Sequence, residues 1–473
     1  MTDHWANFGL DLHLDLQGPR VRTGLEESLR AAIQSGRLAA GSLLPPTRAL
    51  AADLGIARNT VSEAYGQLVA EGWLVARQGS GTRVAAPGPV IESAREQTTA
   101  SKRLPYDLRP GYPDVGSFPR PAWLAAARAA VNAAPSEAFG YGDPQGLPVL
   151  RCALAAYLSR ARGVRVTPER VVVCSGFTQG LWLLGSVLHA RGARRVGVES
   201  HGHRQHRDLL GQCGLAPSVL PVDGSGATPA GLSALDAVLL TPAHQFPRGV
   251  ALDPERRAEF TRWAASSGAL ILEDDYDGEF RYDRRPVGAV QALAPEHVAY
   301  LGTASKTLAP GVRLGWMVLP QELVRPVTER LAAVAVQTSA LDQLTLAELI
   351  RTGAYDKHVR RSRLAYRRRL ERLLDTLKRA TPELTTSGLA AGLHTVLELP
   401  EGSDESGLER VAAARGLAVE GMRRYAAPGH AGPPALVIGY ATPPQHAYSS
   451  ALARLAATLA GLRGSESEIR RHH

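Results

Sequence analysis

The stretch "GTASKTLAPGVRLGWMVLP", residues 302–320, sets a lysine among small hydroxylated residues, follows it with an arginine, and ends in an apolar run. Its Lys306 is one of only four lysines, because 50 of the 54 Lys and Arg residues are arginine. The two residue types carry the same charge, but only lysine can lose its proton and attack a carbonyl as an amine. Lys306 is therefore a candidate for the covalent attachment of a carbonyl compound.

Three neighbours of Lys306 suit a phosphate group. Arg313 offers a bidentate pair of donors, and Thr303 and Ser305 add hydroxyl groups. A pyridoxal phosphate cofactor would use such donors together with backbone N–H groups at a helix start, a carboxylate for its ring nitrogen and a donor for its phenolic oxygen. The sequence contains a candidate for each of these partners.

The segment "SGFTQG", residues 175–180, is the candidate for the backbone donors. It follows the apolar run "VVVC" and precedes the helical run "LWLLGSVL". The N–H groups of Gly176, Phe177 and Thr178 would then lie at a helix start, where anions bind. Taken alone, a glycine-containing turn between a strand and a helix is a common structural element.

The segment "ALILEDDYDGEF", residues 269–280, supplies the carboxylate. It places Asp274 at the end of a buried strand, and doubly wound sheets bind ligands at the carboxyl ends of their strands. Asp274 would hold the proton of the ring nitrogen, and Tyr276 would bond to the phenolic oxygen. The alternatives are a solvated acidic turn and a magnesium site, but neither explains the buried strand that leads into it.

Short β-branched runs alternate with helical stretches through most of the chain. Examples are "RVVVC", "RRVGVE", "DAVLLTP", "ALILED" and "VAYLGT". This pattern predicts a multidomain α/β protein with a mostly parallel, doubly wound sheet. We expect this domain over residues 107–465, with a large part at about 135–330 and a smaller α+β part at about 380–465.

A linker is predicted at residues 86–106, which are poor in large apolar residues and rich in Pro, Ser, Thr and charge. A chain of 473 residues is also too long for one ordinary core. Twenty extended residues span at most about 70 Å, enough to let the flanking domains separate or swap over a partner subunit. Residues 1–85 are therefore expected to form their own domain.

Residues 44–84, "LPPTRALAADLGIARNTVSEAYGQLVAEGWLVARQGSGTRV", predict a helix from near Thr47, a turn at Gly55, a second helix over 58–71 and two strands around a Gly-Ser-Gly turn. This order is typical of a winged helix-turn-helix that reads DNA, whereas the alternative is a helical hairpin packed on another domain. Arginine reads guanine and asparagine reads adenine. The candidate DNA-binding residues are Arg48, Arg58, Asn59, Thr60, Arg77, Gln78, Gly79 and Ser80.

The charge distribution permits a nucleic-acid partner without requiring one. The net charge is +9, but residues 1–85 carry eight Arg and eight Asp and Glu, so DNA contacts there depend on where the arginines lie. The run "KHVRRSRLAYRRRLER", residues 357–372, predicts a helix that is solvated rather than bound to phosphate.

Other features narrow the class of protein. The sequence shows no secretory signal at its N-terminus and no run of eighteen apolar residues, so we expect a soluble cytoplasmic protein without a membrane partner. Cys152, Cys174 and Cys213 are odd in number and lack metal-ligand spacing. We expect core thiols, with no disulfide framework and no metal site.

The N-terminal motif resembles the GntR-type winged helix-turn-helix almost end to end. The motifs that follow, "YGDPQGLPVLR", "TPAHQFPRG", "EDDYDGEFRY", "GTASKTLAPGVRLGWMVLP" and "GLHTVLEL", make the whole chain similar to the MocR branch of GntR regulators. Those proteins join the winged helix to a fold-type I aminotransferase-like domain. The resemblance implies pyridoxal phosphate on Lys306, with Asp274, Tyr276 and Arg313 as its partners.

The resemblance implies further roles. His244 and Gln245 would lie near the cofactor, Tyr141 would reach the phosphate of a neighbouring subunit, and Arg424 of "GMRRY" would bind an effector carboxylate. Two departures are visible: His203 of "ESHGHRQ" stands where relatives place an aromatic residue that stacks on the ring, and "GFT" replaces a Gly-polar-Gln form. Backbone donors would survive the second change, whereas the first affects stacking and effector choice.

The sequence thus predicts a dimeric, domain-swapped transcription regulator that binds double-stranded operator DNA and pyridoxal phosphate. Its effector would be a small amino acid or amine, or pyridoxal phosphate itself in a subgroup that controls vitamin B6 synthesis. An amino effector would displace Lys306 from the cofactor, and the small part would close. The alternative is a catalytically active aminotransferase with an appended DNA-binding module.

Overall fold

The computed structural model describes residues 21–77, 80–85, 104–282, 287–334 and 337–469. The chain divides into two units between Ser101 and Lys102, inside the predicted linker. Strand β3 (Tyr106–Asp107) already belongs to the second unit, because it pairs with a strand near residue 417. We propose the domain boundaries predicted from the sequence with one adjustment, namely that the second domain begins at β3.

The described residues of the first unit form three helices and a two-stranded antiparallel sheet. Its elements are α1 (Val21–Gln34), α2 (Thr47–Leu54), α3 (Arg58–Ala70), β1 (Leu74–Arg77) and β2 (Gly81–Val84). Helix α2 begins after Pro46 and ends at Gly55, whose φ of 66° is the left-handed conformation that glycine adopts without strain. All five elements contribute to one buried cluster, so the predicted helix pair and hairpin are confirmed.

A seven-stranded sheet forms the centre of the second unit, in the order β4-β12-β11-β10-β9-β5-β6. All neighbouring strands are parallel except β12, which runs antiparallel to β11 and β4. The strands are β4 (Val171–Cys174), β5 (Arg195–Glu199), β6 (Ala216–Leu220), β9 (Ala237–Leu240), β10 (Leu270–Asp274), β11 (Val298–Thr303) and β12 (Gly315–Val318). The predicted α/β fold with a mostly parallel sheet is confirmed.

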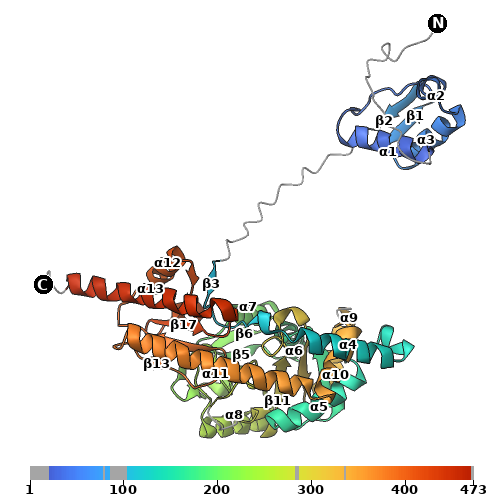
Figure 1. Ribbon diagram of the computed structural model, residues 1–473. Helices are drawn as coiled ribbons and strands as arrows, with labels where there is room; N and C mark the ends of the chain where they lie inside the picture. The colour runs from blue at the N-terminus through green and yellow to red at the C-terminus, as the bar shows by residue number, and fades with distance from the viewer. Residues whose placement is uncertain (1–20, 78–79, 86–103, 283–286, 335–336, 470–473) are drawn as a thin grey trace. The chain divides into compact units, whose positions relative to one another are not determined.

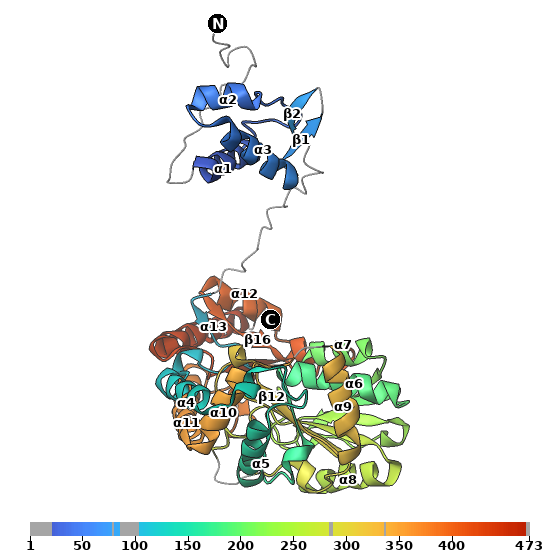
Figure 2. The same cartoon turned by 90° about the vertical axis from the view of Figure 1, so that its right-hand side faces the viewer.

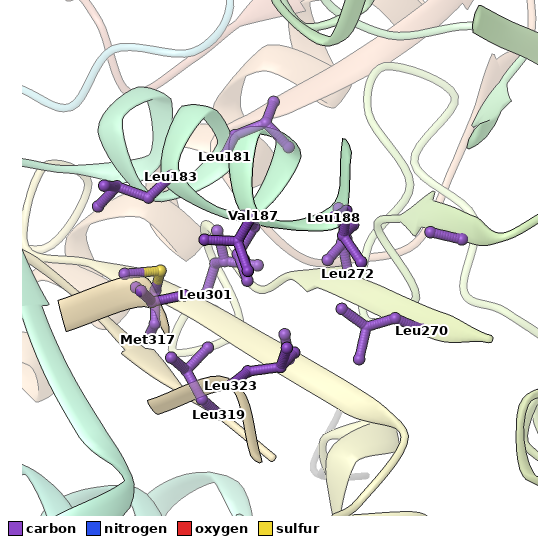
Figure 3. Close-up of a cluster of buried hydrophobic side chains, with 14 of the residues drawn as sticks. Leu181, Leu183, Val187, Leu188, Leu270, Leu272, Leu301, Met317, Leu319 and Leu323 are labelled. Atoms are coloured by element: carbon purple, nitrogen blue, oxygen red, sulfur yellow. The ribbon is translucent and has the colours of Figure 1, made fainter. Parts of the chain in front are cut away.

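Helices cover both faces of this sheet (Figure 1, Figure 2). They are α4 (Arg120–Ala133), α5 (Pro148–Arg162), α6 (Phe177–Ala190), α7 (Arg204–Gln212), α8 (Pro254–Ser267), α9 (Gln321–Ala333) and α10 (Ala340–Arg351). On one face, leucines of α6 and α9 pack on β10, β11 and β12 (Figure 3). On the other, α5 and α10 pack on β4, β11 and β12, so the central strands are buried on both sides.

The C-terminal part forms a smaller α+β layer within the same unit. Its elements are α11 (Ala354–Ala380), β13 (Thr386–Ser387), β14 (His394–Glu398), α12 (Glu405–Ala414), β15 (Leu417–Ala418), β16 (Glu420–Gly421), β17 (Ala435–Gly439) and α13 (Tyr448–Ile469). Four of these strands form an antiparallel sheet in the order β13-β14-β17-β16, and α11 and α13 lie side by side (Figure 1). Strand β15 pairs with β3, and β7 (Val222–Asp223) and β8 (Gly226–Ala227) form a separate hairpin.

Two minor predictions need correction. The basic run lies in α11, but Arg369 is buried there and forms an ion pair of 2.7 Å with Asp114, so not every arginine of this helix is solvated. The three cysteines are free; Cys174 is buried, whereas Cys152 is exposed and is not a core thiol. Within the described ranges, none of the helices combines the length and the apolar character needed to cross a bilayer.

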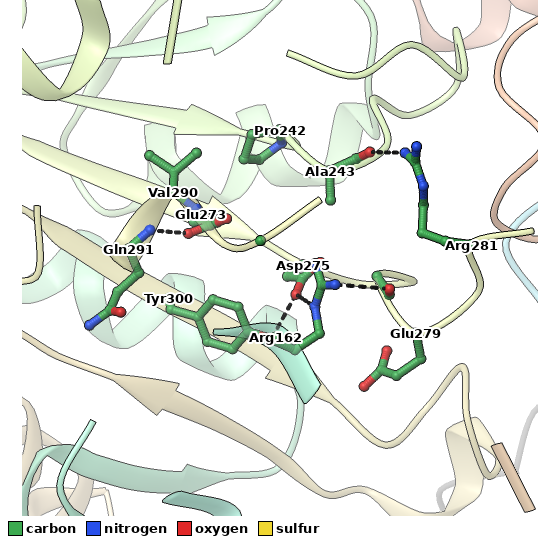
Figure 4. Close-up of polar contacts among 12 residues, drawn as sticks. Arg162, Pro242, Ala243, Glu273, Asp275, Glu279, Arg281, Val290, Gln291 and Tyr300 are labelled. Carbon is green, nitrogen blue, oxygen red and sulfur yellow. Dashed lines mark hydrogen bonds and ion pairs between the residues drawn. The ribbon is translucent and has the colours of Figure 1, made fainter. Parts of the chain in front are cut away.

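A buried ion pair connects α5 to the turn after β10 (Figure 4). Arg162 donates two hydrogen bonds to Asp275, with N–O distances of 2.6 Å and 3.0 Å, and a third to the carbonyl of Gly278. The hydroxyl of Tyr300 also donates to Asp275, at 2.7 Å. The two charged side chains are 4% and 1% exposed, so each depends on the other for its counter-charge.

We expect Arg162→Met to destabilise the protein strongly, because the Asp275 carboxylate would stay buried without its counter-charge. Breaking one side of a buried pair costs about 3–5 kcal/mol. The matched control is Arg160→Met on the same helix, whose pair with Asp356 is 60% and 21% exposed and is expected to contribute at most about 1 kcal/mol. Urea unfolding followed by tryptophan fluorescence compares the two, and equal losses of stability would contradict this account.

Candidate functional site

A pocket of about 330 Å³ opens at the carboxyl ends of the sheet strands in the second unit. Five strands end at it, because residues at or just after the ends of β4, β5, β9, β10 and β11 line its wall. Ten predicted residues line this pocket: Gly176, Phe177, Thr178, His203, Asp274, Tyr276, Thr303, Ser305, Lys306 and Arg313. Segments that are more than a hundred residues apart in sequence therefore meet at one site.

Lys306 is half-buried in the turn after β11 and donates a hydrogen bond of 2.5 Å to the carbonyl of Gly111. Burial lowers the pKa of Lys306, while the charges of Asp274 and Asp277 oppose that shift. A lowered pKa makes the neutral amine more available, which is the form that attacks a carbonyl. The environment of Lys306 thus suits a nucleophilic lysine.

Asp274 is the last residue of β10 and is 8% exposed. Its Oδ1 is buried and has no hydrogen-bond partner among the described residues. Burial raises the pKa of Asp274 well above its ordinary range, Lys306 opposes this, and Asp275 and Asp277 add to it. An N–H donor on a bound ring would satisfy this oxygen, as the predicted role of Asp274 requires.

Tyr276 is buried two residues after Asp274, and a polar group behind it holds its hydroxyl. The Nδ1 of His244 lies 3.1 Å from this hydroxyl and 2.8 Å from Oδ2 of Asp277. Burial raises the pKa of Tyr276, and the charge of Asp277 raises it further, so the phenol keeps its proton. Tyr276 can therefore donate a hydrogen bond into the pocket.

The pocket also brings together the groups predicted to bind phosphate. Helix α6 begins here after Gly176, whose φ is 128°, and no side chain caps the helix start. Arg313 has a φ of 53° and is the only non-glycine residue with a positive φ in the described chain, which marks a strained backbone of the kind found at functional sites. The close approach of β12 explains Gly315, because a Cβ there would lie 2.7 Å from Cα of Gly176.

Four predicted site residues lie elsewhere. His244 and Gln245 do not line the pocket but stand behind it, where His244 supports Tyr276 and Gln245 donates to the carboxylate of Glu199. Tyr141 is fully exposed and does not reach the pocket of its own chain. Arg424 is also outside it, because its side chain is 66% exposed and pairs with Glu420 at 3.5 Å.

Sequence reasoning missed several lining residues. Glu199 ends β5, so the rule that located Asp274 could have found it; its pKa is raised to about 7 by burial. Phe246 lies within the quoted motif "TPAHQFPRG" and stacks on His203 with ring centres 4.3 Å apart. Arg207 is one of many arginines, and Gly111 lies 195 residues before Lys306, so no local pattern marks either one.

The first unit presents the predicted DNA contacts on its surface. Arg48 is exposed near the start of α2, Arg58 and Asn59 are exposed at the start of α3, and Thr60 beside them is half-buried. At the hairpin, Arg77 and Ser80 are exposed. Gln78 and Gly79 fall outside the described residues.

The folds and sites define a class of protein: a DNA-reading winged helix joined to an aminotransferase-type domain. Residues 22–84 match the family of bacterial regulatory proteins, gntR family, and residues 111–436 match aminotransferase class I and II. The chain is 34% identical to the HTH-type pyridoxine biosynthesis transcriptional regulator PdxR of Corynebacterium glutamicum, over 86% of this chain and 88% of that protein.

A second regulator and an aminotransferase structure are also similar to this chain. The probable rhizopine catabolism regulatory protein MocR of Rhizobium meliloti is 33% identical, over 83% of this chain and 84% of that protein. The α-aminoadipate aminotransferase LysN of Thermus thermophilus shares the fold, with a TM-score of 0.68 and 24% identity over 77% of this chain and 94% of that one. The chain belongs to the MocR-type GntR regulators; it is a DNA-binding transcription regulator whose second domain binds pyridoxal phosphate.

We expect Lys306→Ala to abolish covalent attachment of the cofactor. After incubation with pyridoxal phosphate and reduction with borohydride, mass spectrometry of wild-type protein should show one adduct, on the peptide that contains Lys306. The matched control is Lys357→Ala at an exposed position of α11, which should keep the adduct. An adduct that survives in Lys306→Ala would assign the attachment to another group.

The pH dependence of cofactor capture follows from the lowered pKa of Lys306. Only the neutral amine attacks, so the capture rate should rise with pH and level off below the pKa of about 10.4 of a solvated lysine. Stopped-flow absorbance of cofactor-free protein measures this, with a lysine-containing peptide as the control for titration of the cofactor itself. A protein profile that coincides with the peptide profile would contradict the assigned environment.

Proposed function

We propose that the second domain senses a small amino compound, or pyridoxal phosphate itself, and changes operator binding by the first domain. The observation that carries this proposal is that one pocket is lined both by Asp274, whose Oδ1 has no hydrogen-bond partner among the described residues, and by Lys306. When bound, pyridoxal phosphate supplies an aldehyde carbon that exchanges one amine for another. An amino effector and Lys306 therefore compete for the same carbon.

The pocket residues would bind different parts of the cofactor. Lys306 would carry it, Asp274 would accept the N–H of its ring, and Tyr276 would donate to its phenolic oxygen. The phosphate would lie against Arg313, with further donors from the start of α6, residues 176–178, and from the hydroxyl groups of Thr303 and Ser305. His203 would meet the ring face in place of a larger aromatic side chain.

A contact between Lys306 and the start of the second domain offers a route to the linker. Lys306 donates to Gly111, and Thr442 donates to the carbonyl of Arg109 at 2.6 Å and to that of Tyr112 at 3.2 Å. This segment follows β3 and therefore lies close in sequence to residues 86–103. If the Lys306 amine bound another group, the Gly111 carbonyl would lose this donor. The segment around Gly111, which lies next to the linker, would then be held less tightly.

A domain-swapped homodimer in the cytoplasm is the proposed working form. Tyr141 is 100% exposed, and other large apolar side chains are exposed with it, which is the pattern of a surface covered by a partner. They include Tyr112 at 54%, Leu124 at 68% and Phe139 at 49%. In such a dimer, Tyr141 would reach the phosphate of the neighbouring subunit, and two winged helices would bind two operator half-sites.

One relative favours pyridoxal phosphate as the signal in place of an amino acid. The 34% identical PdxR is named as a regulator of pyridoxine biosynthesis. In that case, occupancy of the pocket would change DNA binding without any amino effector. Gel-shift titrations of operator DNA with cofactor-free protein, cofactor-loaded protein, and loaded protein plus amino acids distinguish the two signals.

The same proposal predicts little or no transaminase turnover. Steady-state assays with several amino donors and a keto-acid acceptor measure it. Turnover at enzyme-like rates, together with DNA binding that no ligand changes, would favour the rival function of an aminotransferase with an attached DNA-binding module.

We expect Arg58→Ala to weaken operator binding by about 1–3 kcal/mol, because the Arg58 side chain is exposed at the start of α3. Cofactor uptake should not change. The matched control is Arg37→Ala, since Arg37 is exposed in the turn after α1, outside α2, α3 and the hairpin. Shift assays at fixed salt measure both variants, and equal affinities would remove Arg58 from the DNA interface.

A further inference from the structure

Arg207 of helix α7 lines the pocket, and none of the described acidic side chains lies within ion-pair distance of it. Its guanidinium contacts only backbone carbonyl groups, of Gly202 and Tyr425 at 3.5 Å and of Ala426 at 3.3 Å. It forms no ion pair with any described carboxylate within 4.0 Å, and loss of solvent lowers its pKa. A half-buried arginine with three long contacts retains donors for an anion.

The position of Arg207 joins the two parts of the second domain. Gly202 donates to the carbonyl of Tyr425 at 3.0 Å, and Ala427 donates to the carbonyl of Ser200 at 2.7 Å. Arg207 bonds to carbonyl groups on both sides of this junction. An anion held by Arg207 would therefore touch the place where the smaller part meets the pocket.

His203 and His206 line the pocket together with Arg207 and Lys306. The pKa of His206 is lowered to about 3 by burial first, and then by the charges of His203, Lys306 and Arg207. A neutral His206 adds no charge of its own. The pocket thus has two separate cationic groups besides Lys306: Arg313 at the phosphate end and Arg207 at the junction.

The size of the pocket limits what binds beside the cofactor. Ligand pockets span about 300–1,000 Å³, so one of about 330 Å³ leaves little room beyond pyridoxal phosphate. The effector must therefore be small. Arg424, the carboxylate partner predicted from the sequence, is 66% exposed, pairs with Glu420 and does not line the pocket.

We propose that Arg207 binds the carboxylate of the effector, which makes the effector a small amino acid rather than a simple amine. This inference rests on the proposed function, because it requires the cofactor in the same pocket. It assigns effector specificity to a residue of α7. The same contact would strengthen the junction between the two parts of the domain when the effector binds.

Two unreactive probes test this proposal: N-(5′-phosphopyridoxyl)-L-alanine and N-(5′-phosphopyridoxyl)ethylamine, which differ only in the carboxylate. Calorimetric titration of the full-length, cofactor-free protein should show that wild type binds the alanine adduct more tightly by about 10- to 100-fold, the range expected for charge-assisted hydrogen bonds. Arg207→Gln should remove this preference and still bind the ethylamine adduct. The matched control is Arg204→Gln on the same helix, 80% exposed, which should keep the preference.

Three results would overturn the proposal: equal affinity of wild type for the two adducts, a preference that persists in Arg207→Gln, or a preference lost in Arg424→Gln instead. If Arg207→Gln binds neither adduct, the preference for the alanine adduct is measured in Arg207→Lys, which keeps the charge but not the planar pair of donors. A reduced preference then supports the proposal, and an unchanged one refutes it. If wild type binds neither adduct, the cofactor site itself is wrong, and the role of Arg207 fails with it.

Discussion

The buried ion pair between Arg162 and Asp275 is the contact on which the pocket depends. Asp275 stands between Asp274 and Tyr276, which line the pocket, and its own side chain is held by α5 and Tyr300 on the other side of the turn. Neighbouring carboxylates repel each other, and Asp275 does raise the pKa of Asp274. The guanidinium of Arg162 offsets this charge, so Asp274 can face the pocket on a rigid turn.

Side chains that lie behind the pocket hold the lining side chains in place through hydrogen bonds. His244 bridges Tyr276 and Asp277, and Gln245 donates to Glu199 and to the carbonyl groups of His201 and Phe246. A binding site holds its geometry only when such supporting contacts lock the rotamers of its lining residues. The carboxyl ends of the parallel strands supply the lining, and the loops that follow supply the support.

Nine of the ten predicted lining residues lie at the end of a strand or within four residues after it, and Arg313 lies two residues before β12. Asp274 and Lys306 each lie within three residues of the end of a strand, so the strand pattern predicted their position at the sheet edge. The sequence did not predict Gly111 and Arg207 as pocket residues, because the contacts that place them there join segments that are distant in the chain. Arg424 does not line the pocket, although the carbonyl of the next residue, Tyr425, accepts a hydrogen bond from the pocket residue Gly202; the Arg424 side chain pairs with Glu420.

The cores of the two units share no residue. One buried cluster draws only on residues 25–84, and the others draw only on residues from 108 onward. Stability effects of substitutions at distant, independent sites add. Substitutions that retarget the winged helix to a new promoter would therefore leave the core of the second domain unchanged, so the genes that such a protein controls can change in evolution while its second domain stays the same.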